Sequence, residues 1–189
     1  MELVSEAIIF AVKAHDGMRR KNSEIPYILH PVEAAAIVGS MTADQEIIAA
    51  AALHDVVEDA GITFDELREK FGERVARLVG AETENKREEL PPSTTWRIRK
   101  EEAINVLSTT SDIAVKMLFL GDKLANLRSI FTEWRKIGNA VWNRFNQKEP
   151  AEQEWYYRAI SENLRELSDT PAWLELDGII NAIFGRKTV

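Results

Sequence analysis

The spacing of apolar residues along the chain predicts a series of helices. Apolar side chains recur every three or four positions over residues 3–15, which is typical of an amphipathic helix. Pro31 suits the first turn of a following helix, because its missing N–H needs no partner there, so His30 would lie at that helix's entrance. Seven consecutive apolar residues (47–53) favour a buried helix, and the polar residues that follow should lie where it opens into a cleft.

The second half of the chain continues this pattern. Thr63 and Glu66 form a capping box ahead of a helix that reaches Phe71. Residues 82–95 are polar and contain two adjacent prolines, which predicts the longest loop. Other helices are expected over residues 32–40, from Thr42 or Asp44 through the polar stretch, around 75–79, over 96–107, from Ser111 or Asp112 to Phe131, and near 133–146, 151–168 and 171–185.

No segment of useful length alternates with the period of a strand, and there is no internal repeat or low-complexity tract. The sequence therefore predicts an all-α fold. A length of 189 residues favours one domain. We expect that domain to span residues 1–189, with a core at about 4–131 and a C-terminal helical extension at about 132–189.

Composition narrows the classes of function. The absence of cysteine excludes disulfides and thiolate metal sites, and a net charge of −7 argues against non-specific binding to nucleic acid. The chain has no N-terminal signal segment and no apolar run near the roughly 20 residues that span a bilayer, so we expect a cytoplasmic protein without a membrane partner. Basic residues at 19–21 and in the cluster 96–100 fit a small, multiply phosphorylated ligand, although each group could also be a solvated face.

Candidate chemistry is concentrated in His54, Asp55, Glu58 and Asp59. The imidazole and the carboxylate of the adjacent His54 and Asp55 can reach a single metal ion. Because positions i and i+4 share a helix face, we expect Glu58 below His54 and Asp59 below Asp55. Two further carboxylates would then lie beside whatever the first pair holds.

Additional ligands must come from other segments. Asp122 lies in an otherwise apolar stretch (118–126), where an unpaired carboxylate is costly to bury, and Asn126 and Ser129 follow on the same helix face. Together with His30 and the His-Asp pair, Asp122 would give two imidazoles and two carboxylates and leave coordination positions open. Such a set suits manganese, zinc, iron or magnesium.

The order of these residues resembles the H…HD…D pattern of the HD phosphohydrolase superfamily. Within it, the chain is similar to the hydrolase domain of RelA/SpoT proteins and to their stand-alone relatives, the small alarmone hydrolases. The resemblance covers about residues 4–131. The matching segments are residues 14–17, 20–21, 26–31, 52–59, 71–72 and 122–128.

This resemblance implies a helical bundle of the HD type and metal-dependent hydrolysis. It implies manganese (Mn²⁺) held by the residues that match His30, His54, Asp55 and Asp122. The implied reaction removes pyrophosphate from the 3′ position of guanosine tetraphosphate or pentaphosphate (ppGpp or pppGpp). The implied partner is therefore a small phosphorylated nucleotide.

The resemblance also implies roles for residues around the ion. Glu58 and Asp59 match an acidic pair that positions or deprotonates the attacking water. On physical grounds, His15 is expected to brace the site or to lie in the core rather than to ligate the ion. The substrate-binding candidates are Arg20 and Lys21 around the guanine, Asn126 at the nucleotide, and Ser129 on the same helix face.

Three departures from the family's pattern affect the nucleotide pocket. Ala125 stands where the family often has histidine, residues 82–86 replace a Thr-Lys-Leu pattern, and residues 22–25 replace a glycine-containing loop. None of them removes a proposed metal ligand. They leave open a hydrolase of another phosphorylated nucleotide, for example a 3′-phosphatase acting on NADPH. A non-catalytic nucleotide-binding module is the third interpretation.

Overall fold

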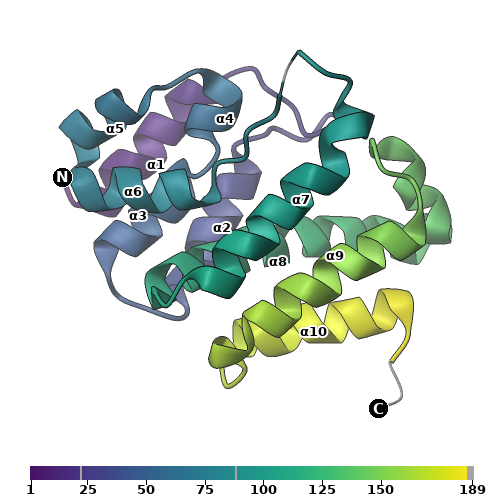
Figure 1. Cartoon of the computed structure of the whole chain (residues 1–189). Helices are drawn as coiled ribbons and strands as arrows, with labels where there is room; N and C mark the ends of the chain where they lie inside the picture. The colour runs from purple at the N-terminus through teal and green to yellow at the C-terminus, as the bar shows by residue number, and fades with distance from the viewer. Residues whose placement is uncertain (22, 88, 187–189) are drawn as a thin grey trace.

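The computed structural model describes residues 1–21, 23–87 and 89–186, and its helices confirm the all-α prediction (Figure 1). Within these residues no β-strand forms, and the nearest approach to one is an isolated antiparallel bridge between Arg19 and Pro26. No helix in the described ranges combines the length and the apolar character needed to cross a membrane. The elements in chain order are α1 (Leu3–Ala14), α2 (Leu29–Gly39), α3 (Gln45–Leu53), α4 (Val56–Ala60), α5 (Phe64–Phe71), α6 (Glu73–Glu82), α7 (Pro92–Thr109), α8 (Ile113–Ile137), η1 (Gly138–Arg144), α9 (Pro150–Asn163), η2 (Arg165–Leu167) and α10 (Pro171–Phe184).

Helix α8 lies at the centre of the fold and packs against α2, α3, α6 and α10. Its N-cap is Asp112, whose side chain accepts a hydrogen bond from the Ala114 N–H at 2.9 Å. Leu118 and Leu120 are fully buried although they point to nearly opposite sides of the helix. A helix that is apolar on most of its circumference is one that is covered on most sides. Three polar residues of α8, Lys116, Asp122 and Lys123, therefore lie deep in the molecule.

Helices α2 and α8 approach so closely that only glycine fits at one point of contact. A Cβ atom at Gly121 would lie 2.7 Å from Val38 Cγ2 and 3.0 Å from the backbone oxygen of Ala34. Real Cβ atoms do not approach a neighbour at the shorter of these distances. This contact brings the start of α2, which carries His30, beside Asp122 on α8.

The polar stretch after the apolar run does not form one continuous helix, which corrects the sequence prediction. Helix α3 ends at Leu53 and α4 begins at Val56, so His54 and Asp55 lie in the break between them. The Asp59 N–H still donates to the Asp55 backbone oxygen at 2.8 Å, which keeps these two residues one turn apart. No corresponding contact links Glu58 to His54 among the described residues.

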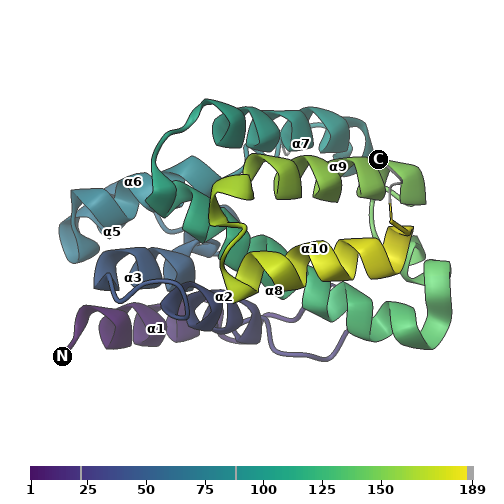
Figure 2. The ribbon, with the colours of Figure 1, turned by 90° about the horizontal axis from the view of Figure 1, so that it is seen from below.

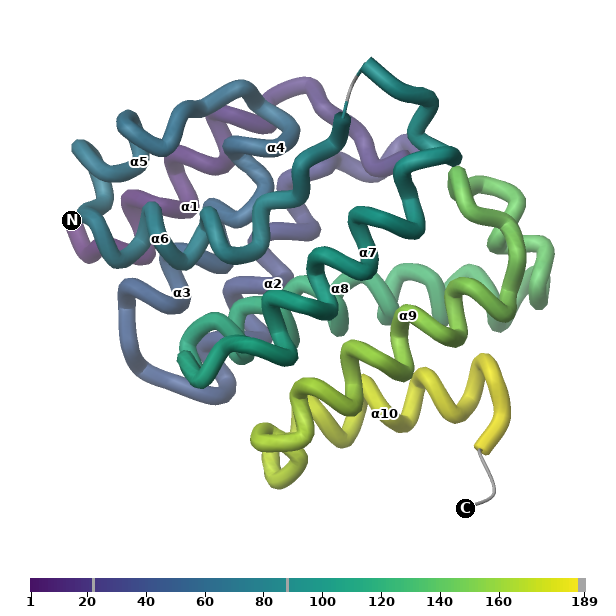
Figure 3. The backbone as a smooth tube through the Cα atoms, viewed as in Figure 1, coloured from purple at the N-terminus to yellow at the C-terminus, as the bar shows by residue number. Residues whose placement is uncertain are grey.

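Further boundaries also differ from the prediction, among them those of α7 and α8. Helix α7 begins at Pro92, four residues before the expected start, because proline is favoured in the first turn of a helix. The connection from α6 to α7 is correspondingly shorter, and Figure 3 shows it running past α4. Helix α8 continues to Ile137, and the predicted helix at 133–146 is replaced by the end of α8 and by η1.

The C-terminal helices cover one side of this core. Helix α9 lies alongside α7 and α10, and α10 packs against α8 (Figure 2). The Arg128 guanidinium on α8 joins Glu175 on α10 through two hydrogen bonds of 2.7 and 2.6 Å. Because these contacts tie the extension to the central helix, we propose that the whole chain is one domain.

Candidate active site

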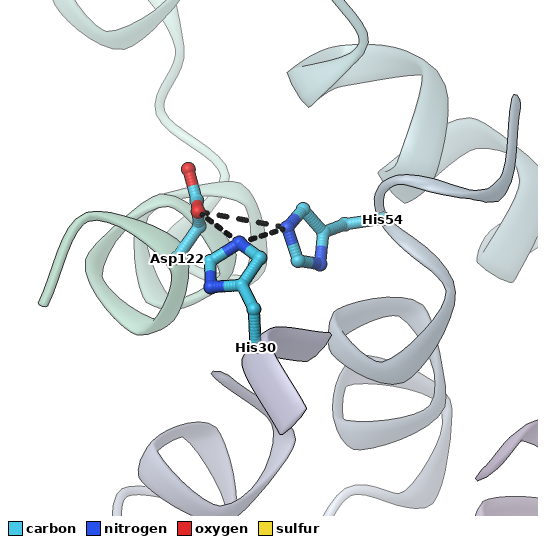
Figure 4. A group of neighbouring side chains, drawn as sticks. All are labelled: His30, His54 and Asp122. Atoms are coloured by element: carbon cyan, nitrogen blue, oxygen red, sulfur yellow. Dashed lines mark hydrogen bonds and ion pairs between the residues drawn. The ribbon is translucent and has the colours of Figure 1, made fainter. Parts of the chain in front are cut away.

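Four side chains from three separate parts of the chain converge at the break between α3 and α4. His30 Nε2 lies 3.0 Å from Asp122 Oδ1 and 3.4 Å from Asp55 Oδ2. His54 Nε2 lies 3.1 Å from Asp55 Oδ2, 3.5 Å from Asp122 Oδ1 and 3.2 Å from His30 Nε2. Figure 4 shows His30, His54 and Asp122 pointing toward one another. The predicted metal ligands thus lie together, and their role as ligands stays a prediction.

The chemistry of this donor set fits a divalent cation. His54 Nδ1 lies 2.8 Å from the backbone oxygen of Ala51, and since that oxygen can only accept, Nδ1 carries the proton. In the neutral imidazole, the Nε2 lone pair then faces carboxylate oxygens of Asp55 and Asp122 at 3.1 and 3.5 Å. Lone pairs and negative charges at such distances repel one another unless a positive charge lies between them.

The shifted pKa values of His54 and Asp122 also indicate that this cluster is stabilised by positive charge. Burial favours neutral imidazole, but the Asp55 and Asp122 carboxylates outweigh it and raise the pKa of His54 well above its ordinary value. Burial also opposes ionisation of Asp122, yet the Lys123 ammonium and the two imidazoles hold the pKa of Asp122 well below its ordinary value. A cluster with these properties attracts either protons or a metal ion.

Tyr27 joins a predicted metal ligand to the predicted acidic pair. Its hydroxyl lies 2.7 Å from Asp55 Oδ2 and 2.6 Å from Asp59 Oδ2, so two carboxylates share one O–H. Burial and these carboxylates raise the pKa of Tyr27, which therefore stays protonated and donates. Tyr27 lies in one of the segments that match the family's pattern, but no role is predicted for it from the sequence. The only indication of a role in the sequence is that Tyr27 lies three residues before His30, a predicted metal ligand.

The connection between α6 and α7 packs onto the acidic pair. Lys86 Nζ donates to the Glu58 backbone oxygen at 3.0 Å and to Asp59 Oδ1, and the Glu84 N–H donates to Glu58 Oε2 at 3.2 Å. Burial, followed by the charge of Asp55, raises the pKa of the Glu58 carboxyl to about 6. A carboxyl with such a pKa can accept and release a proton near neutral pH, as a general base must.

The converging side chains and the acidic pair border a cavity of about 190 Å³, which we call the metal cavity. Within the described residues two further cavities adjoin it, and Arg20 borders all three. One of about 180 Å³ lies toward α9, and one of about 610 Å³ lies along α2 and α8. Arg20 Nη2 donates to Asn126 Oδ1 at 2.7 Å, and Asn126 borders the metal cavity and the cavity toward α9. These two substrate-binding candidates therefore lie where the cavities meet.

The other two substrate-binding candidates lie further from the ligands. Ser129 borders the two adjoining cavities but not the metal cavity. Lys21 borders none of the three within the described residues, and its Nζ donates to Asn146 Oδ1 at 2.9 Å. Of the loop that departs from the family's pattern, Ser23 and Ile25 border the largest of these three cavities, and Asn22 lies outside the described residues.

The basic cluster 96–100 divides into two groups. Arg99 and Lys100 border the metal cavity, and both donate to Glu84, at 2.7 and 2.6 Å. The Arg97 guanidinium instead lies 3.3 Å from the centroid of the Trp155 ring on α9. Of these two groups, only the first borders the metal cavity.

Several residues that the sequence analysis did not assign also border the metal cavity. They make contacts with segments distant in sequence, which no local pattern reveals. His15 is buried, its ring centroid lies 5.0 Å from that of Tyr27, and neither ring nitrogen has a hydrogen-bond partner among the described residues, so its bracing role stays a prediction. The unassigned residues that border the cavity are Tyr27, Glu82, Glu84 and Lys123.

The chain is similar in sequence to hydrolases of known name. It is 36% identical over 134 residues to a guanosine-3′,5′-bis(diphosphate) 3′-pyrophosphohydrolase of Aquifex aeolicus and 38% identical over 135 residues to one of Vibrio cholerae. Each alignment covers 69% of this chain but only 18% of the relative. The chain thus spans less than a fifth of the length of these relatives.

Solved structures and a family model extend the comparison. A metazoan orthologue of SpoT, described as hydrolysing ppGpp, superposes with a TM-score of 0.77 at 26% identity and 98% coverage of both chains. A Listeria monocytogenes protein superposes with a TM-score of 0.72 at 32% identity, covering 83% of this chain and 99% of that one. The HD domain model matches residues 7–149, a range that includes all four converging side chains. This chain therefore belongs to the HD-domain family.

Proposed function

We propose that this chain is a metal-dependent hydrolase that removes the 3′-pyrophosphate of guanosine tetraphosphate or pentaphosphate. Water forms a bond to the phosphorus next to O3′, the P–O3′ bond breaks, and O3′ takes up a proton. The products are pyrophosphate and GDP or GTP. Relatives in two bacteria carry this activity in their names, and the metazoan structural match hydrolyses ppGpp.

One observation carries this proposal: two imidazoles and two carboxylates meet beside a half-buried acidic pair, in a cavity that Arg20, Arg99, Lys100 and Lys123 also border. His30, His54, Asp55 and Asp122 would hold the ion, for which we propose Mn²⁺. When bound, a divalent cation lowers the pKa of water and offsets the charge of phosphate oxygens. A binding module would need no acidic pair next to such a site.

The acidic pair would control the water and its proton. Glu58 is assigned as the proton acceptor, because its raised pKa of about 6 matches the work of a base near neutral pH. Asp59 is held from two sides, by the Tyr27 hydroxyl and by Lys86 Nζ. A carboxylate fixed in this way suits an orienting role, since its position does not change as the proton moves.

Positive charge around the adjoining cavities fits a nucleotide with phosphates at both ends. The cavity toward α9 is bordered by Arg20, Lys100, Lys123 and Arg144, and within the described residues by no carboxylate. With the 3′-pyrophosphate in the metal cavity, these cations would face the 5′-phosphates. The larger cavity has Ile25, Leu29 and Ile137 on its border, which suits a base, and the Arg20 guanidinium can stack on a purine.

The test is turnover by the purified full chain, stripped of metal and then supplied with Mn²⁺. We expect pyrophosphate and GDP from ppGpp, separated by ion-exchange chromatography. His54→Ala should lose both Mn²⁺ and activity, whereas Glu102→Gln, which removes an exposed partner of Arg87, should retain both. The absence of turnover in protein with Mn²⁺ shown to be bound would refute the proposal.

A substrate panel separates the proposal from its nearest competitor. NADPH, ppGpp and pppGpp are offered at equal concentrations to the same Mn²⁺-loaded protein. We expect the guanosine nucleotides to be hydrolysed with the higher kcat/KM. A preference for NADPH, with phosphate as the product, would replace the proposed substrate while leaving the hydrolytic machinery in place.

A further inference from the structure

Glu82 is a carboxylate at a position that its helix otherwise fills with apolar side chains. It is the last residue of α6 and follows the fully buried Leu78 and Val79 by four and three positions. Only 6% of Glu82 is exposed, and its Oε2 has no hydrogen-bond partner among the described residues. Burial of a carboxylate is costly, so its place in the wall of the metal cavity calls for a compensating interaction.

That interaction is with the ammonium group of Lys123. Lys123 Nζ donates to Glu82 Oε1 at 3.0 Å and also to Asp122 Oδ2. The ammonium is thus held between carboxylates from two helices, α6 and α8, and is 5.3 Å from the centroid of the Phe119 ring. Lys123 is itself buried, with 7% exposed, so water does not compete strongly for its three N–H donors.

The two oxygens of Asp122 consequently have different partners. Oδ2 is bound by the Lys123 ammonium, whereas Oδ1 faces the imidazoles, 3.0 Å from His30 Nε2, and accepts from Asn126 Nδ2 at 2.6 Å. Asp122 can therefore offer a metal ion one oxygen. This arrangement depends on the position of the Lys123 ammonium. Because Lys123 and Asp122 are neighbours in the chain, a residue from another segment has to hold the ammonium in place.

We propose that Glu82 is a positioning residue for the metal ligand Asp122, acting through Lys123. By taking part of the ammonium's charge, Glu82 stops Lys123 from neutralising Asp122 fully, and by holding its position it leaves Oδ1 directed at the ion. This inference rests on the proposed metal site and is independent of which nucleotide is hydrolysed. Partners of metal ligands commonly change metal affinity when they are removed.

The test measures Mn²⁺ affinity without nucleotide, by titrating the full chain and following the electron paramagnetic resonance signal of free Mn²⁺. We expect Glu82→Ala to weaken binding by about 10- to 100-fold. Glu82→Gln keeps the shape and an acceptor for Lys123 but removes the charge, so a smaller loss is expected. It also keeps the question open to measurement if Glu82→Ala does not fold, which circular dichroism would reveal.

Glu84→Gln is the matched control, because Glu84 borders the same cavity but binds Arg99 and Lys100 instead of Lys123. An equal loss of affinity in Glu84→Gln and Glu82→Gln would overturn the proposal, since only the charge of the cavity would then matter. Affinity within twofold of the wild type in folded Glu82→Ala would also overturn it.

The route through Lys123 is tested by adding Lys123→Met to Glu82→Ala. With the ammonium gone, Asp122 is no longer neutralised by it, so the double variant should recover at least part of the lost Mn²⁺ affinity. No recovery would exclude this route. If the wild-type chain fails to hydrolyse ppGpp while the expected differences in Mn²⁺ affinity are still observed, the proposed substrate is rejected and the positioning role remains intact.

Discussion

Replacing Tyr27 with phenylalanine removes one hydroxyl and keeps the ring that packs against His15. That hydroxyl has a single proton, which Asp55 Oδ2 and Asp59 Oδ2 share at 2.7 and 2.6 Å, so the variant loses the equivalent of one charge-assisted hydrogen bond. Hydrogen bonds to charged groups contribute about 1.5–3 kcal/mol. If the bond positions both carboxylates for reaction, kcat/KM should fall about 10- to 100-fold at saturating Mn²⁺.

The assay is pyrophosphate release from ppGpp by the Tyr27→Phe variant, with Mn²⁺ affinity and melting temperature measured in parallel. Asp59→Asn provides the second arm of a double-mutant cycle. Because Tyr27 and Asp59 are the two partners of one hydrogen bond, the loss of kcat/KM caused by Tyr27→Phe should be smaller in the Asp59→Asn background. Unchanged kcat/KM in Tyr27→Phe, or strictly additive losses, would refute the reasoning.

Other predictions address the base, the substrate and the core. The rate should rise with pH through about 6, because Glu58 can accept a proton only when it is ionised and its pKa is raised to about 6. The Glu58→Gln variant should lose this rise in the pH–rate profile and still bind Mn²⁺. Arg20→Ala should raise KM about tenfold or more with a smaller change in kcat, measured by steady-state kinetics, and an unchanged KM would contradict its role at the nucleotide. Gly121→Ala should lower the melting temperature by about 2–4 °C, because the added methyl group meets Val38 and the backbone of Ala34. The resulting strain exceeds the gain in helix propensity. A higher melting temperature would show that α2 and α8 can move apart without cost.

Hydrophobic spacing and capping patterns were sufficient to predict most of the helices. The capping box of Thr63 and Glu66 is present as expected, and α1 ends one residue before the predicted boundary. The break at His54 and Asp55 escaped this reasoning because both residues keep backbone angles near those of a helix. Sequence periodicity does not register an interruption that is only two residues long.

The candidate site was predictable where function requires particular residue types at fixed intervals. The His-Asp pair, His30 and Asp122 follow such a pattern, and they do converge. Contacts made by the connection between α6 and α7 were not predictable, because its path depends on where α7 begins. Lys86 contacts Asp59 only because the connection follows this path. Nothing in the local sequence around a lysine in a polar loop indicates such a partner.

The four converging side chains have a consequence for folding as well as for catalysis. They come from the start of α2, the α3–α4 break and the middle of α8, segments that an unfolded chain would not hold together. An ion bound by all of them would act as a removable cross-link, adding about 2.7 kcal/mol to the free energy of unfolding at a hundred times its dissociation constant. Depletion of the ion would then expose the polypeptide to proteases at the same time as it stops turnover.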